Sequence, residues 1–149
     1  MLEEGSKAPD FKLPAQDGQK YSLGSFDSSY LVLYFYPKDN TPGWTTEAVS
    51  FRDHIPGLQE LNTSVAGISQ DNLETHRKFA ASNDIRFPLL ADVEGEVCSK
   101  YDVLNFFGLV KRTTYIIELG RYEIIKAYPE VHVDGHVERI IDFLENTSS

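Results

Sequence analysis

The sequence predicts an α/β sandwich in which helices flank a central mixed β-sheet. Apolar stretches of strand length alternate along the chain with helical patterns, as expected when helices connect parallel strands. Residues 30–36 are apolar throughout, which is typical of a central strand that is covered on both faces. Strand patterns over 113–119 and 122–128 meet at Gly120-Arg121 and predict a hairpin, so the sheet includes an antiparallel pair.

Turn, proline and cap signals bound the elements of the first half. Asp17-Gly18 is a turn signal. Pro37 ends the apolar strand, and Pro56 should kink the first helix as it continues beyond residue 54. Asp71 or Asn72 should cap the next helix. In order, the expected elements are an extended segment over 8–13, a short strand over 19–23, a strand over 30–36, a helix over 44–53, a strand over 64–69 and a helix over 73–82.

The second half completes the alternation. A short strand is expected over 87–90, a short helix over 94–101, the hairpin over 113–128 and a last helix over 136–145. That helix carries apolar residues on one face, namely Val137, Ile140, Ile141 and Leu144. Because no repeat, low-complexity tract or linker interrupts the pattern, we expect one domain over residues 1–149.

Composition excludes several classes of partner. The 14 basic and 23 acidic residues give a net charge of −9, and an acidic surface repels nucleic-acid phosphates and anionic lipids. No apolar run approaches the roughly 18 residues of a membrane span. A basic start followed by an apolar stretch, the mark of a secretory signal, is also missing. We therefore expect a cytoplasmic protein without nucleic-acid or membrane partners.

Sulfur and imidazole chemistry are sparse. Cys98 is the only cysteine, which excludes an internal disulfide and a thiolate zinc site. We expect a buried structural thiol there, because nearby Glu94 and Glu96 would raise its pKa. His132 and His136 flank an Asp-Gly turn that breaks helical spacing, so no metal site and no cofactor are predicted. The other two histidines, at 54 and 76, are expected on helix surfaces.

The segment over 34–48 carries the chemical signal. A buried strand ends at a proline-bounded loop, and the loop leads into the start of a helix. Free backbone N–H groups and partial positive charge at a helix N-terminus make a donor-rich, electropositive site. Such a site stabilises anions and lowers the pKa of a cysteine placed there.

This segment resembles the active-site motif of peroxiredoxins, in particular the Q or bacterioferritin-comigratory-protein subfamily. That motif has a proline, three residues, a threonine, two residues and then the peroxidatic cysteine. Pro37 and Thr41 match, whereas the cysteine position is occupied by Trp44. Further matching segments span nearly the whole chain, at residues 5–11, 50–53, 67–71, 87–92, 112–115 and 133–136.

The resemblance implies a thioredoxin-like fold and a thiol peroxidase reaction. In that family a cysteine thiolate attacks the peroxide and becomes a sulfenic acid, a second thiol resolves it to a disulfide, and thioredoxin reduces the disulfide. By motif matching, the Thr41 hydroxyl would contact the peroxide, Arg112 would stabilise negative charge, Pro37 would shield the pocket and Glu47 would orient Arg112. The implied partners are a hydroperoxide and a thioredoxin-like reductant, and the implied assembly is a monomer or a homodimer.

The thiols themselves are missing. Besides Trp44, the usual resolving position is Val49, and an alternative one falls near Phe79-Ala80. Two explanations follow: a chain derived from an active thioredoxin-dependent peroxide reductase, or a non-catalytic pseudo-peroxiredoxin that binds or regulates a partner. Weak anion binding near Thr41 and Arg112 is a third.

Two residues allow two interpretations each. The Trp44 ring either plugs the pocket, with its indole N–H bonded to a buried partner, or forms part of a binding surface. Arg112 either pairs with Glu47 in a structural ion pair or retains affinity for an anion.

Overall fold

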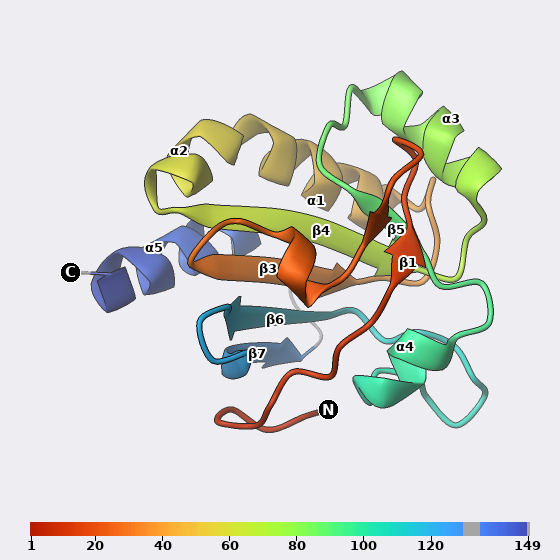
Figure 1. The fold of residues 1–149 in the computed structure, drawn as a ribbon. Helices are drawn as coiled ribbons and strands as arrows, with labels where there is room; N and C mark the ends of the chain where they lie inside the picture. Colours follow the sequence, from red (N-terminus) through yellow and green to blue (C-terminus); the bar gives the residue numbers. More distant parts are fainter. Residues whose placement is uncertain (130–134, 149) are drawn as a thin grey trace.

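The computed structural model describes residues 1–129 and 135–148 and contains a five-stranded mixed sheet of order β5-β4-β3-β6-β7 (Figure 1). At its centre, β3 (Tyr30–Phe35) pairs in parallel with β4 (Thr63–Ser69) and antiparallel with β6 (Thr113–Glu118). Parallel β5 (Leu89–Ala91) and antiparallel β7 (Glu123–Pro129) form the two edges. The expected α/β sandwich with a mixed sheet is confirmed.

The helices on one face start and end close to the predicted positions. The first helical stretch divides into α1 (Pro42–Asp53) and α2 (Ile55–Glu60), so the chain breaks at residue 54 instead of kinking at Pro56. Pro56 lies in the first turn of α2, where a missing N–H costs nothing. Asn72 is the cap of α3 (Leu73–Asn83), because its side chain accepts a 2.9 Å hydrogen bond from the Thr75 amide.

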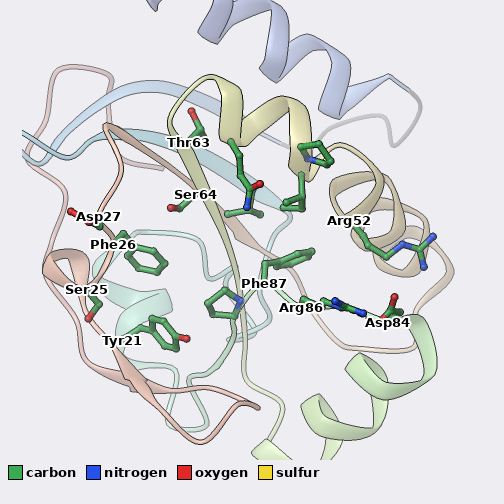
Figure 2. A pocket seen from close by; sticks show the side chains of 15 residues that line it. Tyr21, Ser25, Phe26, Asp27, Arg52, Thr63, Ser64, Asp84, Arg86 and Phe87 are labelled. Atoms are coloured by element: carbon green, nitrogen blue, oxygen red, sulfur yellow. Dashed lines mark hydrogen bonds and ion pairs between the residues drawn. The ribbon is translucent and has the colours of Figure 1, made fainter.

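The remaining elements are short, apart from the last helix. They are the antiparallel pair β1 (Leu13–Pro14) and β2 (Lys20–Tyr21), the 3₁₀ turn η1 (Leu23–Ser25), α4 (Glu96–Lys100) and α5 (His136–Ser148). A groove of about 610 Å³ opens beside β4, between Tyr21 and Phe26 on one wall and Arg52 on the other (Figure 2). Within the described residues, no helix has the length and apolarity needed to cross a bilayer.

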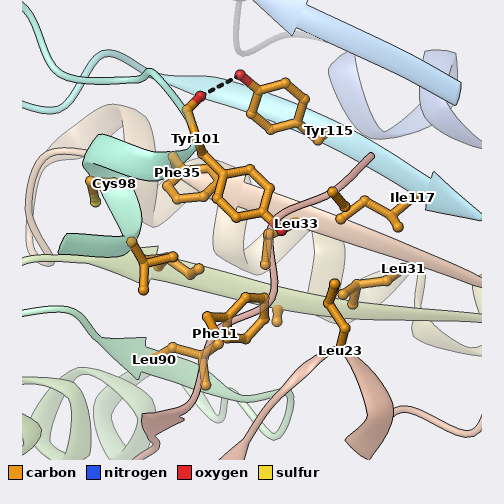
Figure 3. Packing of buried hydrophobic residues seen from close by; sticks show 14 of the residues in the cluster. Phe11, Leu23, Leu31, Leu33, Phe35, Leu90, Cys98, Tyr101, Tyr115 and Ile117 are labelled. Atoms are coloured by element: carbon orange, nitrogen blue, oxygen red, sulfur yellow. Dashed lines mark hydrogen bonds between the residues drawn. The ribbon is translucent and has the colours of Figure 1, made fainter. Parts of the chain in front are cut away.

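Alternation along β3 divides the apolar residues into two cores. Val32 and Tyr34 point to the face with α1, α3 and α5, and Leu31 and Leu33 point to the other face. The second face packs against α4 and the N-terminal segment, through side chains that include Phe11, Leu23, Cys98 and Tyr101 (Figure 3). The start of α1 and the only cysteine therefore lie on opposite faces of the sheet.

Candidate functional site

The start of α1 is built by backbone capping. Pro37 is half-buried directly after β3, and Thr41 occupies the N-cap with extended backbone (φ −84°, ψ 143°). Its carbonyl accepts a 2.9 Å hydrogen bond from the Thr45 amide. Its hydroxyl donates to the Lys38 carbonyl at 2.9 Å, so in this conformation the hydroxyl proton is used within the loop. Pro42 follows as the first helical residue, a position that proline favours.

Trp44 points into the core. It is 0% exposed, and its ring is stacked on Tyr36 with centroids 3.8 Å apart and planes inclined by 14°. Tyr34 and Phe79 complete the stack at centroid distances of 5.2 and 6.0 Å. Gly67 makes room for the indole, because a Cβ there would lie 3.2 Å from Trp44 Cη2. Of the two interpretations of Trp44, the buried plug is the one that the structure shows, and the ring contributes no exposed binding surface.

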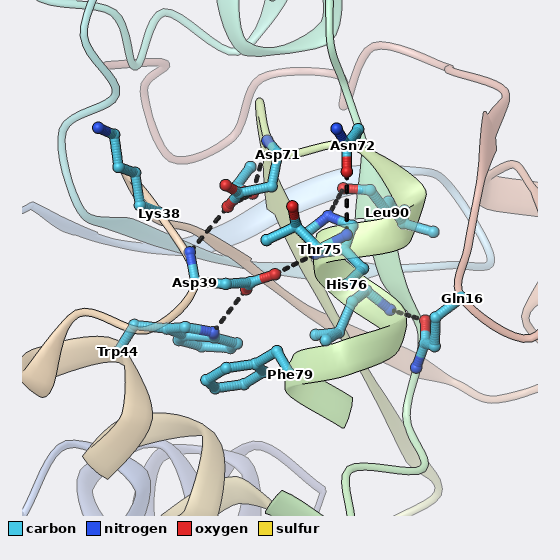
Figure 4. Close-up of polar contacts among 12 residues, drawn as sticks. Gln16, Lys38, Asp39, Trp44, Asp71, Asn72, Thr75, His76, Phe79 and Leu90 are labelled. Carbon is cyan, nitrogen blue, oxygen red and sulfur yellow. Dashed lines mark hydrogen bonds and ion pairs between the residues drawn. The ribbon is translucent and has the colours of Figure 1, made fainter. Parts of the chain in front are cut away.

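The indole N–H is bonded to a buried charged network (Figure 4). Trp44 Nε1 and the Tyr36 hydroxyl donate to Asp39 Oδ1 at 3.1 and 2.8 Å. His76 Nδ1 lies 2.6 Å from Asp39 Oδ2, and its Nε2 lies 3.1 Å from the Leu90 carbonyl. Each ring nitrogen therefore faces an acceptor oxygen, and the imidazole links Asp39 to the Leu90 carbonyl. The predicted surface position of His76 is wrong, since the residue is 0% exposed.

Asp71 extends this network towards the surface. It accepts the Asp39 amide at 2.7 Å and the Ser69 hydroxyl at 2.6 Å through one oxygen. Ligand atoms of Asp39, Asp71 and His76 all lie within 4.8 Å of one another, which is compact enough for a metal ion. Protein groups already engage both Asp39 oxygens and both His76 nitrogens, however, so these atoms are satisfied by hydrogen bonds within the protein.

Arg112 reaches the helix start from the neighbouring strand. Thr113 pairs with Phe35 across the β3–β6 ladder, so Arg112 stands where the loop after β3 begins. Its guanidinium lies against Gly43, where an added Cβ would be 2.1 Å from Arg112 Nη1. Arg112 is half-buried, and it forms no ion pair with any residue in the described ranges. A cationic group and the donor-rich end of α1 therefore meet, as the sequence predicts.

Glu47 does not make the expected contact with Arg112. It is 1% exposed, and neither carboxyl oxygen has a hydrogen-bond partner among the described residues. Burial raises the pKa of Glu47 to about 8, against an opposing effect of Arg139 and a weaker one of Arg112. The carboxyl is therefore largely protonated at neutral pH and gives Arg112 neither a charge nor a hydrogen bond. The reason is geometric, since the guanidinium is placed over Gly43 at the helix start.

A second buried side chain with an unpartnered polar atom, His136, lies at the start of α5. His136 is 0% exposed, and its Nε2 lies 2.9 Å from the Thr114 hydroxyl, while no described residue bonds its Nδ1. Burial lowers the pKa of His136 to about 4, so this ring is neutral at pH 7. The predicted separation of His132 from His136 concerns a residue outside the described ranges.

Cys98 lies on the opposite face of the sheet from this site, and its surroundings disfavour the reactive thiolate. It is 0% exposed, and its amide donates to Asp92 Oδ2 at 2.7 Å. Burial raises the pKa of the Cys98 thiol well above its ordinary value, and the Asp92 carboxylate adds to the effect. Asp92, not the neighbouring glutamates named above, is the charge that acts on this thiol. The predicted structural role of Cys98 agrees with this burial.

Comparison with known proteins decides the family. The AhpC/TSA family matches residues 5–121. This chain belongs to the AhpC/TSA family. A putative peroxiredoxin bcp of Coxiella burnetii is 40% identical over 147 residues, covering 94% of this chain and 97% of that protein. Peroxiredoxin Bcp of Bacillus subtilis is 38% identical over 155 residues, covering 99% of this chain and 98% of that protein. The predicted Q/bacterioferritin-comigratory-protein subfamily is confirmed.

Solved structures of AhpC/TSA relatives share the whole architecture. Peroxidoxin BcpB from Mycobacterium tuberculosis superposes with a TM-score of 0.92 at 33% identity, covering 100% of both chains. The bacterioferritin comigratory protein of Xanthomonas campestris superposes with a TM-score of 0.89 at 28% identity, covering 100% of this chain and 99% of the other. The thioredoxin-like fold predicted from the motifs is therefore confirmed.

The resolving positions implied by that subfamily also carry no sulfur. Val49 is half-buried on α1, and Phe79 is buried on α3 against the indole of Trp44. Ala80 is buried beside Phe79. The residues that sequence reasoning missed are Asp39 and His76, which are 37 positions apart and carry no spacing signal that would pair them.

Proposed function

We propose that this chain is a non-catalytic peroxiredoxin, a pseudoenzyme that binds or regulates a partner. The observation that carries the proposal is the buried indole of Trp44 at the third residue of α1, where the family motif places the nucleophile. An indole in a closed aromatic stack has no lone-pair nucleophile to offer a peroxide. Without a nucleophile, stabilising groups alone retain only a small part of an enzyme's rate enhancement.

Cys98 supplies no substitute nucleophile. A thiol reacts with peroxide as the thiolate, and both burial and Asp92 oppose formation of that thiolate. Its position behind the sheet also separates it from Arg112 and from the start of α1.

The alternative is a chain derived from an active thioredoxin-dependent peroxide reductase by loss of its nucleophile. Retention of Thr41 as N-cap, and of the Arg112 guanidinium against Gly43, favours it. These groups form a cationic, donor-rich site that suits a peroxide or a small anion. The relatives are named peroxiredoxins, so a hydroperoxide and a thiol reductant are the partners we would expect of such a parent.

A peroxide-consumption assay with excess thioredoxin, thioredoxin reductase and NADPH tests the proposal. The native chain should not exceed the uncatalysed rate. Turnover by the native chain that disappears in Cys98→Ala would refute it and assign the activity to that thiol. The Trp44→Cys variant tests the alternative: one equivalent of peroxide consumed per chain would show that only the nucleophile is missing.

The remaining properties stay proposals. We propose a cytoplasmic protein, because its sequence shows no secretory signal pattern, and a monomer or a homodimer, as the family resemblance implies. The −9 charge supports the absence of a nucleic-acid or membrane partner. Sedimentation of the purified chain would establish the assembly.

A further inference from the structure

The first turn of α1 is tied to α3 by two separate routes through Trp44. The ring is stacked on Phe79 of α3, with centroids 6.0 Å apart and planes inclined by 22°. The indole N–H is bonded to Asp39, whose second oxygen holds His76 of the same helix at 2.6 Å. His76 and Phe79 are three residues apart and therefore lie on one face of α3.

That first turn has little intrinsic stability. The Thr41 cap makes no side-chain hydrogen bond to the helix, and Gly43 is a poor helix former because its unfolded backbone is unusually free. The turn begins with the Thr45 amide bonded to the Thr41 carbonyl at 2.9 Å. A single helical turn of this composition does not persist without tertiary contacts. Something beyond the backbone must hold it wound.

We propose that Trp44 is a noncovalent clamp that holds the first turn of α1 against α3 and keeps it wound whatever the redox state of the surroundings. Unwinding the turn would withdraw the indole from its stack with Tyr36 and Phe79. It would also remove one of the three donors on the buried Asp39 carboxylate. Both losses oppose opening, and neither involves a thiol.

The clamp also fixes the cationic end of the helix. Gly43 immediately precedes Trp44, and the Arg112 guanidinium rests on Gly43. A wound first turn therefore keeps Arg112 and the Thr41 cap in one arrangement. Redox conditions cannot change that arrangement through Cys98, which is the only thiol and lies on the far face of the sheet. This inference concerns the helix alone and holds whether or not the chain reduces peroxide.

Amide hydrogen exchange of the folded chain tests the clamp. The amides of residues 45–48 should exchange in the native chain as slowly as those in the middle of α1. Trp44→Phe keeps a ring but loses the N–H, and it should speed exchange of those amides about tenfold, as expected for one lost hydrogen bond to a charged acceptor. Trp44→Ala loses both the ring contact with Phe79 and the hydrogen bond to Asp39, and it should speed exchange of those amides by at least about 100-fold.

Phe51→Leu is the matched control, because it truncates another buried aromatic of α1 outside the first turn. It should lower global stability without selective exchange at residues 45–48. If Trp44→Ala does not fold, Trp44→Phe and Asp39→Asn still decide the question. Rapid exchange at 45–48 in the native chain, or equal effects of Trp44→Phe and Phe51→Leu there, would overturn the clamp. So would a change in protection when the native chain is exposed to hydrogen peroxide and then dithiothreitol.

Discussion

Trp44 and Cys98 occupy equivalent places in two different helices. Each is the third residue of its helix, each is 0% exposed, and each lies beside an aspartate. Trp44 lies in the first turn of a 12-residue helix, and the Arg112 guanidinium lies over Gly43, the residue before it. Cys98 lies in a five-residue helix whose first free amides are taken by Asp92, at 3.2 Å from Val97 N and 2.7 Å from Cys98 N.

The difference shows that the chain has separated a thiol from the environment that would activate it. Positive charge and free donors favour a thiolate at the start of α1, but the side chain there is an indole. At α4 the thiol is present, but a carboxylate has taken the donors and burial disfavours charge. Chemistry at a helix start depends on which partners surround it, so equivalent helical positions differ in reactivity.

Truncation should affect the two positions very differently. Trp44→Ala removes a stacked ring and the donor to Asp39, and should lower the free energy of unfolding by about 4 kcal/mol. Cys98→Ala removes only a sulfur and should cost about 1 kcal/mol. Urea unfolding followed by circular dichroism measures both. Equal losses would mean that the indole is not an anchor.

Glu47, the buried acid in the first half of α1, should make the free energy of unfolding depend on pH. Glu47 has a folded pKa of about 8 and an ordinary value of 4.5, so between these pH values the unfolded chain is ionised while the folded chain holds the proton. Stability should therefore be complete below about pH 4.5, fall by on the order of 5 kcal/mol as pH rises to about 8, and then level off.

Glu47→Gln should remove that slope and raise stability at pH 8. The control is Glu74→Gln, an exposed glutamate of α3 paired only with Lys78 among the described residues, which should leave the slope unchanged. A native profile that is flat from pH 5 to 8 would show that Glu47 is ionised in the folded chain.

The smallest effect is expected from Gly43→Ala. The new Cβ would meet the Arg112 guanidinium, the mobile end of a flexible side chain, so the guanidinium should swing away. The gain in helix propensity and the displacement should leave stability within about 1 kcal/mol of the native chain. A crystal structure of the variant would locate Arg112. A loss above about 2 kcal/mol would mean that Arg112 is fixed more firmly than its half-exposed position indicates.

Local signals predicted most of the fold. The apolar run over 30–36, the Asn72 cap and the Gly120-Arg121 turn each act on neighbouring residues, and the elements that they predict formed within a few positions of their expected bounds. The start of α1 was predictable for the same reason.

The network behind Trp44 was not predictable, because its members meet only through tertiary packing. His76 stands in a polar stretch of α3 and reads as a surface residue, yet the fold buries it against Asp39 and Leu90. The expectation that Glu47 orients Arg112 was not met, also because of how the fold packs these side chains. The family resemblance implied that Glu47 orients Arg112, but the fold places the guanidinium over Gly43, and burial favours the neutral form of Glu47.

The most direct test of the separation between thiol and activating site is the oxidation state of Cys98. The native chain would be treated with a few equivalents of hydrogen peroxide and digested, and the mass of the peptide that contains Cys98 would be measured by mass spectrometry. We expect an unmodified thiol in the folded chain, with oxidation only when the chain is unfolded in urea. Rapid gain of one oxygen atom on Cys98 in the folded chain would contradict this expectation.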